Sequence, residues 1–88
     1  MTELRAQIDD LDGDLITLLA ERATYIDRAV TLKQNENLTA RIPSRVDEVV
    51  TNVRTEATKH SLDPDLAETL WRTLIEWSIA REAEHISE

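Results

Sequence analysis

The feature that most limits the fold of this chain is a row of apolar residues with helical spacing in its first third. Successive members lie three or four residues apart, which is the rhythm of a packed α-helix. The row consists of Leu4, Ile8, Leu11, Leu15, Leu18, Ile26 and Val30. We therefore predict one long helix from about Thr2, which can serve as its N-cap, to Lys33, with the polar run 34–37 as its stop.

Two further helices are predicted behind it. Ser44 is a good N-cap, and Asp47 three residues later gives a capping-box-like start to a helix that frays near His60. The pair Asp63-Pro64 is a strong start signal for the third helix. The chain has one glycine and two prolines, so breakers are rare. We expect an all-α fold in which residues 1–88 form a single domain.

The length of the first helix implies a second copy of the chain. Thirty-two helical residues span roughly 48 Å, whereas a compact monomer of 88 residues has a radius of gyration of only about 12 Å. The helix must extend beyond its own domain, and its apolar row continues along the extension. We predict a homodimer whose long helices pass one another, an intertwined arrangement.

Composition excludes several classes of function. The chain has no cysteine, and its two histidines, His60 and His85, are far apart, so we expect no metal site. The net charge of −8 argues against nucleic acid and anionic membrane as partners. No apolar run approaches about 18 residues, and residues 1–5 show no signal segment, so a cytoplasmic protein is expected.

Two cations lie on the predicted core face of the first helix. Arg22 takes a position where the heptad calls for an apolar residue, and Lys33 follows eleven residues later on the same side. Their Cα atoms would lie roughly 16 Å apart, so both side chains can lean over one small anion. The alternative is an ion pair with Glu82 or another acid, because structural ion pairs are common.

Other polar residues extend this pattern. Arg5 lies roughly 25 Å from Arg22 along the helix, so the two can meet only across an antiparallel dimer; otherwise Arg5 is a solvated end residue. Arg45, in the first turn of the second helix, faces either a bound anion or solvent. Ser78 and Glu82 share a helix face, and the alternative to a site is a solvated edge on which Glu82 pairs with Arg81 or His85. The acidic residues 9–14 are interpreted as a solvated face.

These residues resemble the all-helical, type II chorismate mutase family over nearly the whole chain. The matching segments are Leu4-Arg5, Ile8-Asp9, Leu11-Asp12, Leu15, Leu18-Leu19-Ala20-Glu21-Arg22, Lys33, Ser44-Arg45-Val46, Leu62-Asp63-Pro64 and Leu74-Ile75-Glu76-Trp77-Ser78. The first-helix pattern is specific to the family, and the remaining segments support it. The resemblance implies an isomerase that converts chorismate to prephenate in aromatic amino acid biosynthesis, downstream of the shikimate pathway.

The resemblance also implies a role for each candidate residue. The reaction is a pericyclic rearrangement that needs conformational restraint and electrostatic stabilisation rather than a nucleophile, a metal or a cofactor. Arg22 and Lys33 would bind the enolpyruvyl carboxylate, and Lys33 would also reach the ether oxygen. Ser78 and Arg5 of the partner chain would hold the ring carboxylate, with Arg45 in support. Glu82 takes the place where many bacterial members have a glutamine that donates to the ether oxygen.

Two departures leave the substrate open. A carboxyl group at residue 82 can donate a hydrogen bond only when it is protonated. Val46 follows Arg45 where typical mutases have a glutamate that contacts the ring hydroxyl, and related isochorismate-pyruvate lyases are also apolar there. The alternatives to a chorismate mutase are therefore such a lyase, a mutase for an amino analogue of chorismate, or a non-catalytic helical dimer that serves as a regulatory module.

Overall fold

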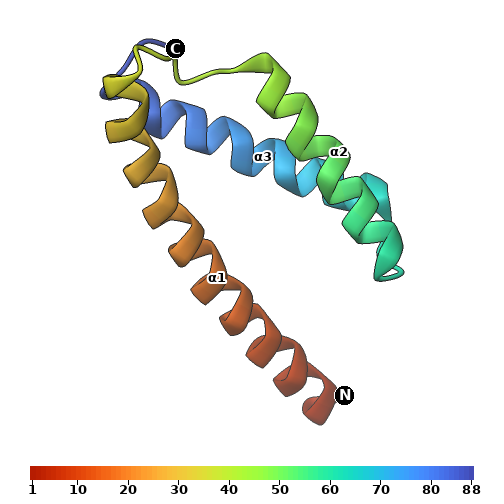
Figure 1. Ribbon diagram of the computed structural model, residues 1–88. Helices are drawn as coiled ribbons and strands as arrows, with labels where there is room; N and C mark the ends of the chain where they lie inside the picture. The colour runs from red at the N-terminus through yellow and green to blue at the C-terminus, as the bar shows by residue number, and fades with distance from the viewer.

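The computed structural model describes all residues from 1 to 88 and contains three α-helices and no strand (Figure 1). Helix α1 spans Thr2–Asn35, α2 spans Pro43–Lys59, and α3 spans Pro64–Ala83. The predicted all-α class and the number of helices are therefore confirmed. None of these helices is both long enough and apolar enough to cross a membrane.

Of the three predicted N-cap residues, one caps its helix in the structure. At α3, the Asp63 carboxylate accepts a hydrogen bond of 2.9 Å from the Asp65 N–H, and Pro64 takes the first helical position, as predicted. The prediction of Ser44 as a cap is wrong, because α2 already begins at Pro43, whose fixed φ suits the first position. Thr2 is likewise inside α1, since the Met1 carbonyl already accepts from the Arg5 N–H.

The ends of α1 and α2 share one backbone motif. Asn37 and Ser61 adopt positive φ values of 56° and 59°. The next residue of each donates back into the last turn, from the Leu38 N–H to the Lys33 carbonyl and from the Leu62 N–H to the Ala57 carbonyl, each at 2.8 Å. This pattern is the Schellman motif, which usually uses glycine. Here it ends both helices without one, and α1 extends two residues beyond the predicted Lys33.

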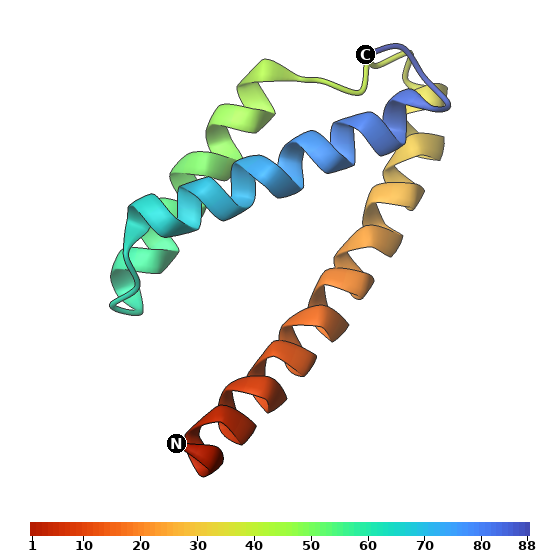
Figure 2. The same cartoon turned by 180° about the vertical axis from the view of Figure 1, so that it is seen from behind.

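The three helices form an open arrangement in which α3 packs against both other helices. Helices α2 and α3 make an antiparallel hairpin, and the C-terminal half of α1 meets the C-terminal half of α3 (Figures 1 and 2). The core is small and lies where these elements converge. Its buried members are Ala40, Val50, Ile75 and Ile79, with Val46, Val49, Ala83 and Ile86 packed against them.

The N-terminal half of α1 projects away from this core (Figure 2). The radius of gyration is 15.5 Å and the longest dimension is 51 Å, so the helix extends beyond its own domain as the sequence predicted. Its apolar row remains between 48% and 62% exposed at Leu4, Ile8, Leu11, Leu15 and Leu18. These large apolar side chains form a continuous patch along the N-terminal half of α1 that the rest of the chain does not cover.

Candidate active site

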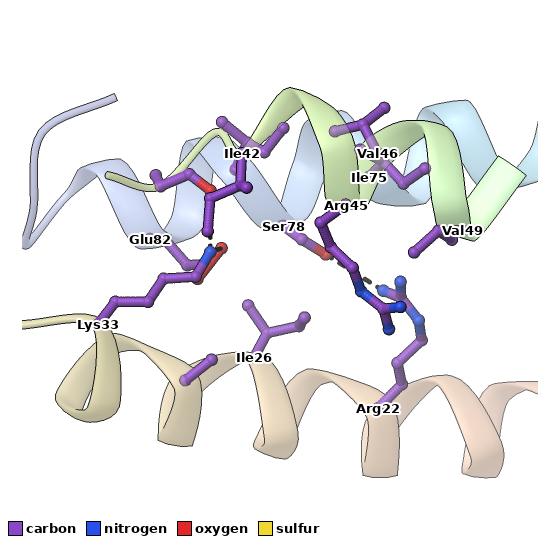
Figure 3. Close-up of a pocket in the computed structure, with 13 residues that line it drawn as sticks. Arg22, Ile26, Lys33, Ile42, Arg45, Val46, Val49, Ile75, Ser78 and Glu82 are labelled. Atoms are coloured by element: carbon purple, nitrogen blue, oxygen red, sulfur yellow. Dashed lines mark hydrogen bonds and ion pairs between the residues drawn. The ribbon is translucent and has the colours of Figure 1, made fainter. Parts of the chain in front are cut away.

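A cavity of about 260 Å³ lies where the three helices approach one another (Figure 3). Each helix contributes polar side chains and part of an apolar lining. Helix α1 supplies Arg22, Ile26, Ala29 and Lys33, whose spacing of four, three and four residues places them on one helix face. Helix α3 supplies Ser78 and Glu82 opposite them, and α2 supplies Arg45 and Val46.

Lys33 makes several close polar contacts at one end of the cavity. Its ammonium donates to the Ala40 carbonyl at 2.9 Å and to Glu82 Oε2 at 3.3 Å, and it lies 2.9 Å from Glu82 Oε1. Glu82 is only 4% exposed. Its Oε1 accepts no hydrogen bond, because the close ammonium approaches it outside hydrogen-bond geometry. The buried carboxylate therefore depends on one lysine, whose positive charge lies close to both of its oxygens.

Ser78 connects the other end of the cavity to α1. Its hydroxyl donates to the Leu74 carbonyl at 2.8 Å and accepts from Arg22 Nη1 at 3.1 Å. The hydroxyl proton is thus committed to the helix backbone, and the guanidinium is held by a neutral oxygen. Ser78 is 5% exposed, so this contact is shielded from water.

The two cations of α1 converge on the cavity. The residues that they contact, Ser78 and Glu82, lie one helical turn apart, a rise of about 6 Å, whereas Arg22 and Lys33 are separated by a rise of roughly 16 Å. The Lys33 side chain therefore leans along α1 toward Arg22, whose guanidinium extends across the cavity to Ser78 (Figure 3). This is the geometry that one small anion with several oxygens requires.

Arg22 has no carboxylate partner in the chain. Burial lowers the pKa of Arg22, and the positive charge of Arg45 lowers that pKa further. A guanidinium nevertheless stays protonated in proteins. Arg45 projects from α2 toward Arg22, and its exposed side chain pairs with Glu48 on its own helix (Figure 3). Lys33 faces Glu82 and Arg45 is paired with Glu48, so Arg22 is the one cation of this cavity without a carboxylate, and it leaves a surplus of positive charge.

The ion pairs decide between the alternative partners that the sequence left open for the two cations of α1 and for Glu82. Lys33 forms the interhelix salt bridge with Glu82, whereas Arg22 forms none. Pairing of Glu82 with Arg81 or His85 does not occur. Arg81 instead binds Asp27 of α1 through two hydrogen bonds of 2.8 and 3.0 Å, outside the cavity.

One candidate lies outside the cavity. Arg5 is exposed in the first turns of α1, at the end of the helix farthest from the convergence of the three helices (Figure 1). Within one chain it therefore does not reach the other candidates. The sequence also did not point to the Ala40 carbonyl or to Arg41 beside it, because a backbone acceptor in a connection has no residue-type signature.

These features define a class: an all-helical protein whose small, partly apolar cavity carries surplus cations suited to an anionic molecule. The sequence model of the chorismate mutase type II family matches residues 4–83. The chain therefore belongs to the chorismate mutase type II family, and the resemblance predicted from the sequence is confirmed.

The relatives are of two kinds. A chorismate mutase of Methanocaldococcus jannaschii is 23% identical over 88 residues, which cover 100% of this chain and 89% of that protein. The T-proteins of Haemophilus influenzae and Enterobacter agglomerans are each 32% identical over 82 residues, 93% of this chain. The chain spans only 22% of the length of those T-proteins. No solved structure matches the chain.

Proposed function

We propose that this chain is a chorismate mutase that rearranges chorismate to prephenate. The single observation that carries the proposal is the half-buried Arg22, a cation without a carboxylate partner, which converges with Lys33 on one cavity. Lys33 is paired with Glu82 and Arg45 with Glu48, so Arg22 leaves the cavity a positive charge that a carboxylate of the substrate can neutralise. Membership of the family supports the same activity.

Each polar residue has a role in this proposal. Arg22 and Lys33 bind the enolpyruvyl carboxylate and hold the compact, chair-like conformer in which the reacting carbons are close. As the ether C–O bond breaks, negative charge grows on the ether oxygen, and Lys33 stabilises it. Glu82 in its protonated form donates to the same oxygen. Ser78 binds the ring carboxylate, and Arg45 adds to the positive field.

The proposal requires a homodimer. The apolar row of α1 lies on the same face of the helix as Arg22 and Lys33, and it is exposed in one chain. A second copy packed along α1 covers it, and in an antiparallel arrangement Arg5 of that copy approaches the cavity. We propose that this Arg5 joins Ser78 at the ring carboxylate. Residues 1–88 then act as one domain, and a cytoplasmic location stays a prediction of the sequence.

A second candidate function rests on Val46. This residue lines the cavity beside Arg45, at the position where typical mutases have a glutamate for the ring hydroxyl. An apolar side chain there offers that hydroxyl no hydrogen bond, so isochorismate, whose hydroxyl is placed differently, is the alternative substrate. Cleavage of isochorismate to salicylate and pyruvate uses the same cations. The same cavity also suits an amino analogue of chorismate, and a helical dimer without catalysis would serve as a regulatory module.

One set of assays tests these functions. The purified protein is given chorismate or isochorismate, and prephenate, salicylate and pyruvate are measured. We expect prephenate from chorismate, and we expect Arg22→Ala to abolish it. Arg28→Ala is the matched control, because Arg28 lies on the same helix and stacks over the exposed Tyr25 ring. Salicylate with pyruvate would establish the lyase, and the absence of every product in a folded dimer would contradict both enzymatic functions.

A further inference from the structure

One of the two groups that hold Lys33 is a peptide group that also contacts residues 87 and 88. The carbonyl of the Ala40–Arg41 peptide accepts from the Lys33 ammonium at 2.9 Å, and the N–H of the same peptide donates to the Glu88 carbonyl at 3.1 Å. The preceding N–H, that of Ala40, donates to the Ser87 carbonyl at 2.7 Å. Residues 87 and 88 therefore fix the direction in which the Ala40 carbonyl points.

The Arg41 side chain secures the same junction from outside. Its guanidinium binds both oxygens of Glu76 on α3, at 2.9 and 2.8 Å, and also binds Glu88 at 3.1 Å. It thus joins the α1–α2 connection, α3 and the residues after α3. Ile86 packs against the core directly below, and Ala40 is itself a buried member of that core.

We propose that Arg41, together with the segment Ile86–Glu88, positions Lys33 for the proposed rearrangement. A lysine ammonium is a mobile point charge on a flexible four-carbon stem, so its direction depends on its acceptors. Two acceptors, the Ala40 carbonyl and Glu82, take part of its hydrogen-bonding capacity and leave a proton for the substrate. If the Ala40 carbonyl turns away, the ammonium moves toward Glu82 and away from the ether oxygen. Arg41 touches no substrate in this arrangement.

An arginine of the same kind elsewhere in the fold serves as a control. Arg54 joins α2 to α3 through Asp65 at 3.0 Å and Glu68 at 2.9 Å. Its side chain is 38% exposed, compared with 35% for Arg41. Exposed ion pairs of this type contribute little to stability. Replacing either arginine by methionine therefore removes a similar surface bridge, and only the change at Arg41 reaches Lys33.

The kinetic test compares the two variants in two backgrounds. Arg41→Met should lower kcat about 10-fold with little change in KM, since a small misplacement of a catalytic group is costly, and Arg54→Met should change neither. In a Lys33→Met background, Arg41→Met should have no further effect, because its influence passes through Lys33. Glu76→Gln should reproduce the loss of Arg41→Met. Equal losses with and without Lys33 would overturn the positioning role.

A second measurement does not depend on activity. In the free protein, the ¹³C-labelled Cε methylene of Lys33 should show two distinct proton signals in the wild type and in Arg54→Met. These signals should collapse toward one in Arg41→Met, as they do for a freely rotating lysine. Unchanged signals in a folded Arg41→Met dimer would overturn the proposal. Collapsed signals in a protein whose wild type converts neither substrate would support the positioning of Lys33 and overturn the proposed function on which its catalytic meaning rests.

Discussion

At the scale of single residues, the capacity of the cavity to bind a carboxylate depends on how few carboxylates line it. Glu82 is its one carboxylate, and that group already faces Lys33. Arg22 is held only by the Ser78 hydroxyl. An incoming carboxylate therefore finds one cation that is free of competition and a second that it must share with Glu82. This asymmetry gives the two cations different expected mutational effects.

Replacing Lys33 by alanine should lower kcat/KM by about 100-fold or more, the usual effect of removing one donor from a developing oxyanion. The loss should fall mainly on kcat, because the charge that Lys33 meets grows in the transition state. Steady-state kinetics on chorismate measures it. Lys59→Ala, which removes an exposed lysine on α2, is the control. A near-normal rate for Lys33→Ala would mean that the Lys33–Glu82 pair has only a structural role.

Replacing Glu82 by glutamine should preserve or increase mutase activity at neutral pH. The amide donates to the ether oxygen without needing a proton and can still accept from Lys33. Steady-state kinetics on chorismate measures it. Loss of activity in a folded dimer would mean that Glu82 acts as a carboxylate, for example by orienting Lys33.

The cavity was only partly predictable from residue types. Arg22 and Lys33 could be found because a helix places residues eleven apart on one side, and Ser78 and Glu82 because they are four apart. The Ala40 carbonyl could not be found. Its direction is set by hydrogen bonds of the neighbouring N–H groups to residues 87 and 88, which are not encoded in local spacing.

At the scale of elements, the helix starts show which local signals dominate. Asp63 and Pro64 agree with each other and give α3 its predicted start. At α2, Pro43 precedes Ser44, and the first helical position suits the proline, so the hydroxyl cap is not used. The polar run that was predicted to stop α1 begins inside the helix, because the Schellman motif at Asn37 decides where the helix ends.

The cap at α3 gives a prediction about stability. Replacing Asp63 by alanine removes the acceptor of the Asp65 N–H and should destabilise the protein by about 1 kcal/mol. Urea unfolding monitored by circular dichroism measures the difference in the free energy of unfolding. Ser44→Ala is the matched control, because Ser44 does not cap α2, and it should cost less than about 0.5 kcal/mol. Equal losses for both variants would contradict the assignment of the caps.

At the scale of the whole molecule, one chain cannot bury its own apolar surface. Only nine of its 88 residues are buried, while large apolar side chains remain exposed along α1 and at Leu66, Leu70 and Trp77 of α3. We expect light scattering at micromolar concentration to give about twice the chain mass of 10.1 kDa. The melting temperature should rise with protein concentration, because association is coupled to folding. A well-folded monomer would contradict the intertwined dimer.

The dimer also predicts sites that are shared between chains. Arg5 and Arg22 lie roughly 25 Å apart along α1, too far for one small ligand, so a complete site takes Arg22 from one chain and Arg5 from the other. Arg5→Ala and Arg22→Ala should each be nearly inactive as homodimers. After the two variants are unfolded together and refolded, about half of the chains should pair as mixed dimers. In each mixed dimer one site carries both mutations, and the other receives both intact arginines.

Activity should therefore return to about one quarter of the wild-type value per chain, since half of the dimers each have one of two sites intact. Native mass spectrometry, with one variant isotopically labelled, measures the mixed dimers directly. A mixture of Arg5→Ala with Arg28→Ala is the control, because its mixed dimers also keep one intact site while the Arg28→Ala homodimers keep two. If mixed dimers of Arg5→Ala and Arg22→Ala form and activity does not return, Arg5 does not complete the site of a second copy.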